Sequence, residues 1–149
     1  MTAPDREGRA LALQYVRCYG RYKAALAQER QAILHGSPAP PDGQPRGGGT
    51  PGDPTAQKVA ALERLEGSHR ARVVRVVEQA RQNVGQDVFS DEERRALQRA
   101  VFRSCLRRSD NPYAEFAAGL NFSKSDFYRR RRRFLDEIAE GIEGDGGDE

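Results

Sequence analysis

Apolar side chains recur at three- and four-residue steps along most of this chain, which is the spacing of a helix that buries one face. The first such repeat, in residues 9–35, consists of Leu11, Tyr15, Tyr19, Tyr22, Leu26 and Ile33. A second repeat follows in residues 54–84, on both sides of a break at Gly67-Ser68. No segment shows the alternation of a half-buried strand, so the sequence predicts an all-α fold, a helical bundle.

The valines between residues 73 and 84 are the one place where a strand competes with a helix, because β-branched residues favour strands. Here they follow helical steps, with Val73, Val76 and Val77 on one stripe and charged residues between them. The spacing therefore favours a helix.

Capping residues mark where the later helices begin. Each start has either a capping side chain followed by proline, or a serine followed three residues later by an acidic residue. The four starts are Asp53-Pro54, Ser90 with Glu93, Asn111-Pro112 and Ser123 with Asp126. They predict, among others, a short helix over residues 112–120 and a last helix that runs to about Ile142.

Composition divides the chain into four parts. Residues 1–36 are expected to form an N-terminal amphipathic helix. Residues 37–53, rich in proline and glycine, are expected to be a flexible or disordered linker. Residues 54–142 then form a helical domain, and the acidic, glycine-rich residues 143–149 are expected to be a disordered tail.

Charge is distributed unevenly along the 149 residues, although the net charge is only +3. Residues 94–135 carry twelve basic and three acidic side chains, a net charge of +9. Residues 136–149 carry seven acidic side chains and no basic one. A basic segment of this density favours a polyanionic partner.

Several classes of protein do not fit the sequence. No apolar run approaches the roughly 20 residues that a membrane span needs, and the N-terminus lacks the apolar core of a secretory signal. Cys18 and Cys105 are too few and too far apart for a disulfide framework, which favours a cytoplasmic location. With His35 and His69 they offer no metal-ligand spacing and no acid–base or nucleophile pair. We therefore expect no cofactor, no metal and no enzymatic activity.

Residues 111–142 have the pattern of a helix-turn-helix. A small residue stands where two helices must approach, Asn121 occupies the turn, and Ser123 caps the second helix. The side chains expected to form its core are Phe116, Ala117, Leu120, Phe122, Phe127, Phe134 and Ile138.

The second helix of this motif carries the candidate DNA contacts, because its other side points away from the core. The candidates are Ser123, Lys124, Ser125, Tyr128, Arg129, Arg132 and Arg133. Five consecutive arginines wrap more than one turn, so they cannot all reach DNA. Arg130 and Arg131 are expected to lay their stems over the core and send their charged ends to solvent or phosphate.

An arginine run on a helix is usually a solvated face. Here the capped helix, the turn and the local net charge of +9 all agree with nucleic-acid binding. Together they favour a nucleic-acid interface over a solvated face.

The chain resembles the ArpU/RinA-type phage transcriptional regulators. The similarity lies in SKSDFYRRRRRFLDEIA at the end, in DPTAQKVAAL in the middle, and in the order of N-terminal helix, Gly/Pro-rich gap and helical half. It covers residues 53–142. These regulators are small, mostly helical activators of late phage genes, and the resemblance implies a C-terminal module like the DNA-binding region 4 of sigma factors.

We therefore expect a sequence-specific, DNA-binding transcriptional regulator, a late-gene activator of phage or prophage type. It would read the major groove of double-stranded DNA with helix 123–142 and work on the nucleoid in the cytoplasm of a bacterial host, with RNA polymerase as a further partner. Two alternatives remain open. One is a phage DNA-packaging component like a small terminase subunit, and the other is a sigma-like adaptor that binds polymerase through its helices.

The N-terminal helix leaves two arrangements open. Its tyrosine-rich stripe steps almost like a heptad seam, so the helix is a candidate for forming a homodimer. Alternatively it folds back as part of a monomeric core. Packing in the core or at a dimer seam is favoured over base stacking for Tyr15, Tyr19 and Tyr22, because this helix is not basic enough.

Overall fold

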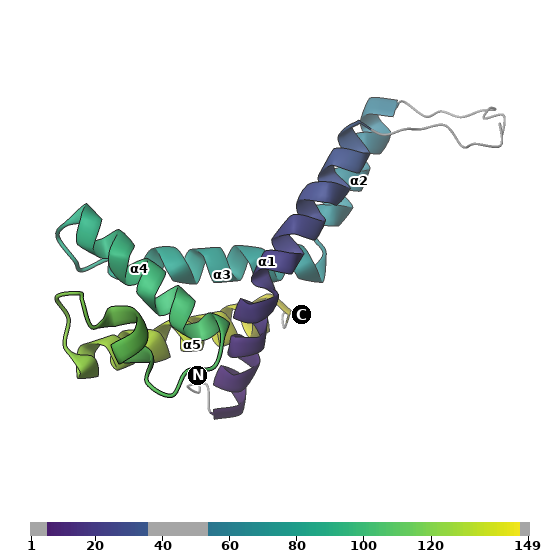
Figure 1. The fold of residues 1–149 in the computed structure, drawn as a ribbon. Coiled ribbons are helices and arrows are strands. Elements are labelled where there is room, and N and C mark those ends of the chain that lie inside the picture. Colours follow the sequence, from purple (N-terminus) through teal and green to yellow (C-terminus); the bar gives the residue numbers. More distant parts are fainter. Residues whose placement is uncertain (1–5, 36–53, 147–149) are drawn as a thin grey trace.

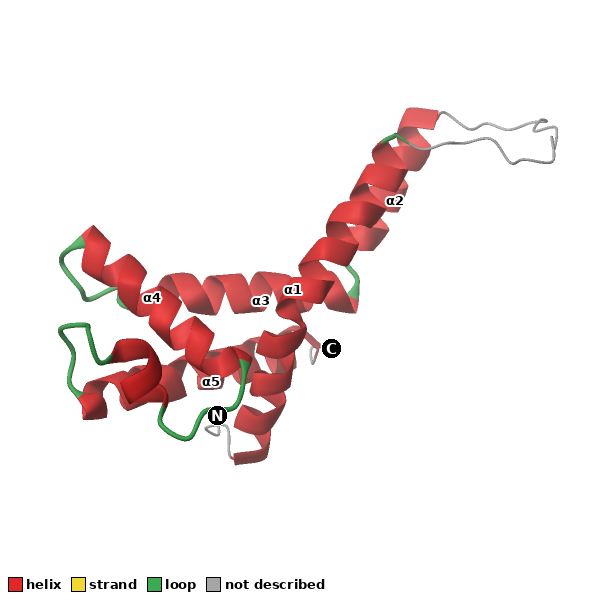
Figure 2. Ribbon diagram, viewed as in Figure 1, coloured by secondary structure: helices red, strands yellow, loops and turns green. Residues whose placement is uncertain are grey.

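The computed structural model describes residues 6–35 and 54–146, and every regular element in them is helical (Figure 2). The all-α prediction is thus confirmed for this part of the chain. In chain order the elements are α1 (Arg6–Leu34), α2 (Pro54–Glu66), α3 (His69–Asn83), α4 (Asp91–Leu106), a single π-helical turn η1 (Tyr113–Ala117) and α5 (Lys124–Gly146). The predicted linker, residues 37–53, lies outside the described residues.

The second half of α1 and all of α2 run antiparallel as an arm that projects from the body of the molecule (Figure 1). Among the side chains described there, Leu26 and Leu65 are buried. An ion pair adds to the contact, because Arg30 lies 2.9 Å from Glu66, and Arg70 at the start of α3 lies 3.2 Å from Glu29 of α1. The arm is therefore held by few apolar contacts and by polar ones at its surface.

The body is built where the first half of α1 packs against α3, α4 and α5 (Figure 1). Each helix gives one apolar stripe to a single buried cluster. Its largest fully buried apolar members are Phe127, Phe134, Leu97, Ile138, Val16, Val73, Val77 and Val101. Val73 and Val77 thus lie on the buried stripe of a helix, as their spacing predicts, whereas Val76 of the same predicted stripe is half-buried.

Within this single chain the N-terminal helix packs against the body, and the homodimer stays a prediction. Tyr19 is buried against the Phe102 ring, 5.6 Å between centroids, and its hydroxyl donates a 2.6 Å hydrogen bond to Glu78. Burial and this carboxylate together raise the pKa of Tyr19. Tyr15 and Tyr22 both contact the ring of His69. The tyrosine stripe is thus used inside the molecule.

Three of the four predicted capping residues make the expected bonds, and the fourth, Asp53, lies outside the described residues. Ser90 Oγ accepts a hydrogen bond from the backbone N–H of Glu93 at 3.2 Å, and Ser123 Oγ accepts one from Asp126 at 3.0 Å. Asn111 Oδ1 accepts one from Ala114 at 3.2 Å. Ser68, at the predicted break, ends α2 and caps α3 by accepting a bond from Ala71.

Two boundaries differ from the prediction. The expected helix 112–120 is shorter, because only Tyr113–Ala117 forms the π-helical turn. The last helix does not end at Ile142 but continues to Gly146, into the predicted tail, whose residues 147–149 lie outside the described residues. Ile142 packs against the core, and helical hydrogen bonds extend about one turn beyond this last anchored residue.

Candidate nucleic-acid interface

The start of α5 is held by η1 and the turn between them. The Tyr113 hydroxyl donates a 2.9 Å hydrogen bond to the carbonyl oxygen of Phe122, at the end of the turn. The Tyr128 hydroxyl accepts a 3.1 Å hydrogen bond from the backbone N–H of Tyr113. These two bonds join η1, the turn and the first turns of α5 into one unit.

The predicted motif core lies in the apolar cluster of the body. Four of its side chains are fully or almost fully buried: Ala117, Phe127, Phe134 and Ile138. The other three are half-buried and pack against the same cluster: Phe116, Leu120 and Phe122. The Phe127 ring lies 5.9 Å from the Tyr113 ring and 5.4 Å from the Tyr128 ring. Phe127 is therefore the side chain that fixes α5 against η1.

Most of the candidate DNA contacts are exposed, either at the cap of α5 or along the helix itself. They are Ser123, Lys124, Ser125, Arg129, Arg132 and Arg133. Tyr128 differs from the expectation, because it is half-buried and its hydroxyl is bonded to Tyr113. It lies on the side of α5 that faces η1, which sequence spacing alone does not reveal.

The outward arginines of α5 differ in their partners. Arg129 has 73% of its side chain exposed and forms an ion pair with Asp126. Arg133, 80% exposed, lies 3.4 Å from Glu137. Arg132 and Lys124 have no ionic or hydrogen-bond partner among the described residues. Because exposed pairs one turn apart contribute little, a phosphate can compete for Arg129 and Arg133.

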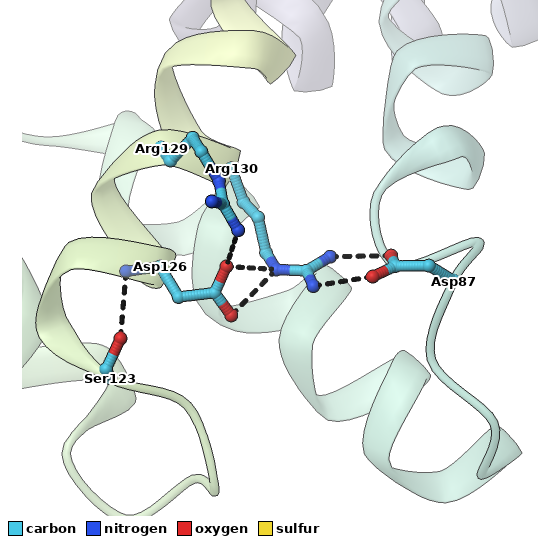
Figure 3. A network of polar contacts seen from close by, with 5 residues as sticks. All are labelled: Asp87, Ser123, Asp126, Arg129 and Arg130. Carbon is cyan, nitrogen blue, oxygen red and sulfur yellow. Dashed lines mark hydrogen bonds and ion pairs between the residues drawn. The ribbon is translucent and has the colours of Figure 1, made fainter.

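The sequence suggested that Arg130 sends its charged end to solvent or phosphate. In the structure the guanidinium group instead binds two aspartates. Its Nη1 and Nη2 each donate a 2.8 Å hydrogen bond to Asp87, and its Nε donates to Asp126 at 3.1 Å (Figure 3). The guanidinium also lies 5.4 Å from the centre of the Phe122 ring, and only 16% of the side chain is exposed. Arg130 therefore ties α5 to the segment that joins α3 and α4.

The Arg130–Asp87 pair also sets the protonation of both groups. Hydrogen bonding to Arg130 lowers the pKa of Asp87 to about 2. Hydrogen bonding to Asp87 likewise raises the pKa of Arg130, against the effect of its partial burial. Both groups thus stay charged at neutral pH.

Arg131 is likewise turned inward, to the last turns of α4. Its Nε donates a 2.9 Å hydrogen bond to Ser104 Oγ, and its Nη2 donates one of 3.2 Å to the Ser104 carbonyl oxygen. Ser104 is fully buried. The expectation of a solvent- or phosphate-facing end is therefore wrong for Arg131 as well, because its stem directs the guanidinium onto acceptors of a neighbouring helix.

The arginine run therefore divides into two inward tethers and three outward cations. Sequence reasoning missed the two partners that make this division, Asp87 and Ser104. They lie 43 and 27 residues before the arginines that they bind. No local spacing could have indicated contacts over such separations.

A cavity of about 400 Å³ lies between α5 and the segment before α4. Its lining includes Arg129, Arg130 and Arg133, but also Asp87 and Glu137. Asp87 already pairs with Arg130, and Glu137 with Arg133, so acidic side chains offset part of the positive charge in the lining.

Other chemistry has little support in the described residues. No group of three or more histidine, cysteine or acidic side chains comes together there as a metal site would need. None of the described helices is long and apolar enough to cross a membrane. Cys105 is buried, and burial raises the pKa of its thiol, so it stays protonated at neutral pH.

Comparisons with family models, curated proteins and solved structures found no match, so the interpretation of this site rests on its geometry and charge.

Proposed function

We propose that this protein is a sequence-specific, DNA-binding transcriptional regulator of the phage or prophage type. In this proposal η1, the turn and α5 act as a helix-turn-helix of the sigma region 4 kind, and α5 enters the major groove. An α-helix with side chains is about 10–12 Å wide. The major groove of B-DNA is about 12 Å wide and admits one helix.

The observation that carries the proposal is the division of α5 into two faces. Phe127 and Phe134 are buried on one face. Ser125, Arg129 and Arg132 are exposed on the other, within the first turns of a helix whose N-terminus is capped by Ser123. Recognition helices read base edges with the side chains of these first turns, and arginine on guanine is the commonest specific contact.

The charge along α5 also limits the contact. Beyond Arg133 the exposed positions become acidic, with Glu140 one turn after Asp136. Asp136 is bound by Arg9 of α1 at 2.8 Å, whereas Glu140 is exposed. Acidic side chains repel phosphate, so DNA contact would end near Arg133.

The inward arginines have a separate part in this proposal. Base reading requires a helix held at one angle, because a small rotation moves the contacting side chains away from the base edges. Arg130 ties α5 to Asp87, and Arg131 ties it to Ser104. The two tethers thus support a fixed presentation of Arg129 and Arg132.

The test starts with the full-length protein and a random duplex library, from which bound sequences are enriched. Binding to an enriched and a scrambled duplex is then measured by fluorescence anisotropy. We expect Arg132→Ala to weaken binding to the enriched duplex about 5- to 150-fold and to relax its sequence preference. Arg64→Ala, which removes an exposed cation of α2, should leave binding unchanged. Failure of the wild-type protein to enrich any sequence or to bind duplex DNA at low salt would overturn the proposal.

A further inference from the structure

The outward face of α4 carries three arginines, one turn apart. Arg95, Arg99 and Arg103 are all exposed. The residues on the other face of the same helix, Leu97 and Val101, are fully buried. The three arginines therefore form one stripe, which we call the α4 ridge.

The α4 ridge has no ionic partner within residues 6–35 and 54–146. None of its three arginines has a hydrogen bond or ion pair with another described residue. The arginines beside the ridge behave differently: Arg94 is paired with Asp91, and Arg107 is paired with Glu115. Like charges one turn apart destabilise a helix. A stripe that lowers helix stability and has no ionic partner in the part of the chain that the structure describes fits an external polyanion.

The dimensions of the ridge suit a nucleic-acid strand. Four residues of α-helix rise by about 6 Å, so the ridge extends over about 12 Å. Each strand of B-DNA carries one phosphate per about 3.4 Å of helix axis, so this length spans about three to four phosphates. The planar guanidinium group can also donate two parallel hydrogen bonds to two oxygens of one phosphate.

The ridge is continuous with the proposed base-reading helix. The hydrogen bonds from Arg131 to Ser104, at 2.9 and 3.2 Å, place the last turns of α4 beside α5. Figure 1 shows the end of α4 crossing α5. Arg103 precedes Ser104 and Arg132 follows Arg131, so an arginine of the ridge and an arginine of the outward face of α5 each adjoin a residue of this contact in the sequence.

We propose that the α4 ridge binds the DNA phosphate backbone beside the groove that α5 occupies. This inference rests on the proposed function. It adds a second, sequence-independent contact that holds the duplex in register while α5 reads the bases. An acidic protein is the other ligand that such a ridge could bind, and the continuity with α5 favours DNA.

The test compares two charge-matched triple variants of the full-length protein. One carries Arg95→Gln, Arg99→Gln and Arg103→Gln. The control carries Arg21→Gln, Arg30→Gln and Arg64→Gln, which remove the same charge from α1 and α2. Glutamine keeps high helix propensity, and thermal unfolding followed by circular dichroism checks that both variants fold. Binding to the enriched and scrambled duplexes is measured between 50 and 300 mM salt.

We expect the ridge variant to weaken binding to both duplexes by a similar factor. The slope of log K against log salt should become shallower by about 2 to 3, because each lost phosphate contact contributes about 0.9. The control should keep the wild-type slope and affinity.

Three results would overturn the inference. An unchanged slope in the ridge variant, with wild-type binding intact, would exclude phosphate contact by α4 and leave the proposed function standing. An equal loss in the control would assign the effect to net charge. No duplex binding by the wild-type protein would instead overturn the proposed function, and the ridge proposal with it.

Discussion

Arg130 places both terminal nitrogens of its guanidinium on the two carboxylate oxygens of Asp87, at 2.8 Å each (Figure 3). The contact joins residues 43 positions apart and links α5 to the turn before α4. That turn has its own constraints: Gly85 adopts a φ of +79°, and its carbonyl oxygen accepts a hydrogen bond from Val88 at 2.9 Å. Asp87 is thus presented to Arg130 by a turn of defined shape.

The low pKa of Asp87 predicts how stability depends on pH. Its pKa is lowered from 3.8 to about 2 by hydrogen bonding to Arg130 in the folded protein. The unfolded chain therefore binds the proton first as pH falls. The stabilisation is fully present above about pH 4 and is lost between about pH 4 and pH 2. Because Asp87 is 70% exposed, Asp87→Asn should cost about 1 kcal/mol or less at pH 7.

The measurement is urea unfolding of the wild type and Asp87→Asn at pH 7, 4, 3 and 2. The difference between them should shrink as the pH falls. Asp110→Asn is the matched control, because Asp110 is exposed and lies outside this network. A stability difference that stays constant down to pH 2 would contradict the Asp87–Arg130 linkage.

Gly141 marks the closest approach of α5 to α3. A Cβ at this position would lie 2.8 Å from Cγ1 of Val76, which is closer than side chains tolerate. We expect Gly141→Ala to destabilise the protein by about 1–3 kcal/mol. At Gly20, in the middle of α1, no atom lies within 4 Å of the added Cβ. Gly20→Ala should therefore stabilise by about 0.5–1 kcal/mol. Thermal unfolding measures the stability of both variants. If both substitutions raised the stability, or both lowered it, the result would contradict this packing.

Local signals in the sequence were enough to predict much of the fold. The stripe of Val73 and Val77 gave the helix α3, and Ser90 and Ser123 gave the starts of their helices. Each of these signals acts within one or two turns, so neighbouring residues contain the whole of the information. The end of α5 was missed, since it depends on Ile142 packing against other helices.

The candidate site was predictable only in part, for the same reason. Helical periodicity separated buried Phe127 from exposed Arg129 and Arg132. It could not assign partners to Arg130 and Arg131, because Asp87 and Ser104 reach them only through tertiary packing. The α4 ridge was visible as a four-residue spacing in the sequence, but only its exposure and lack of partners distinguish it from ordinary surface charge.

Phe127 should dominate the stability of the unit formed by η1, the turn and α5. It is fully buried and contacts the Tyr113 and Tyr128 rings. Truncation of a buried phenylalanine typically costs about 3–5 kcal/mol, and we expect this loss for Phe127→Ala. Phe89 provides the contrast, because its side chain is 100% exposed. Phe89→Ala should change stability by less than about 0.5 kcal/mol. Chemical denaturation tests the pair, and a Phe127→Ala variant as stable as Phe89→Ala would show that α5 does not pack in this register.

The packing of α1 predicts that its apolar stripe stabilises each molecule on its own. Val16 is fully buried against the body, whereas Leu11, in the preceding turn, is 52% exposed. Val16→Ala should cost about 2 kcal/mol, because it removes two buried methyl groups and leaves a cavity. Leu11→Ala should cost clearly less.

If α1 instead formed a seam between two copies, unfolding would be coupled to dissociation, and the Tm would rise with protein concentration. We expect the same Tm for the wild type at 2 and 200 μM and an equal loss of Tm for Val16→Ala at both concentrations. A Tm that rises across this range, with a Val16→Ala defect that shrinks as concentration increases, would assign the stripe to a dimer.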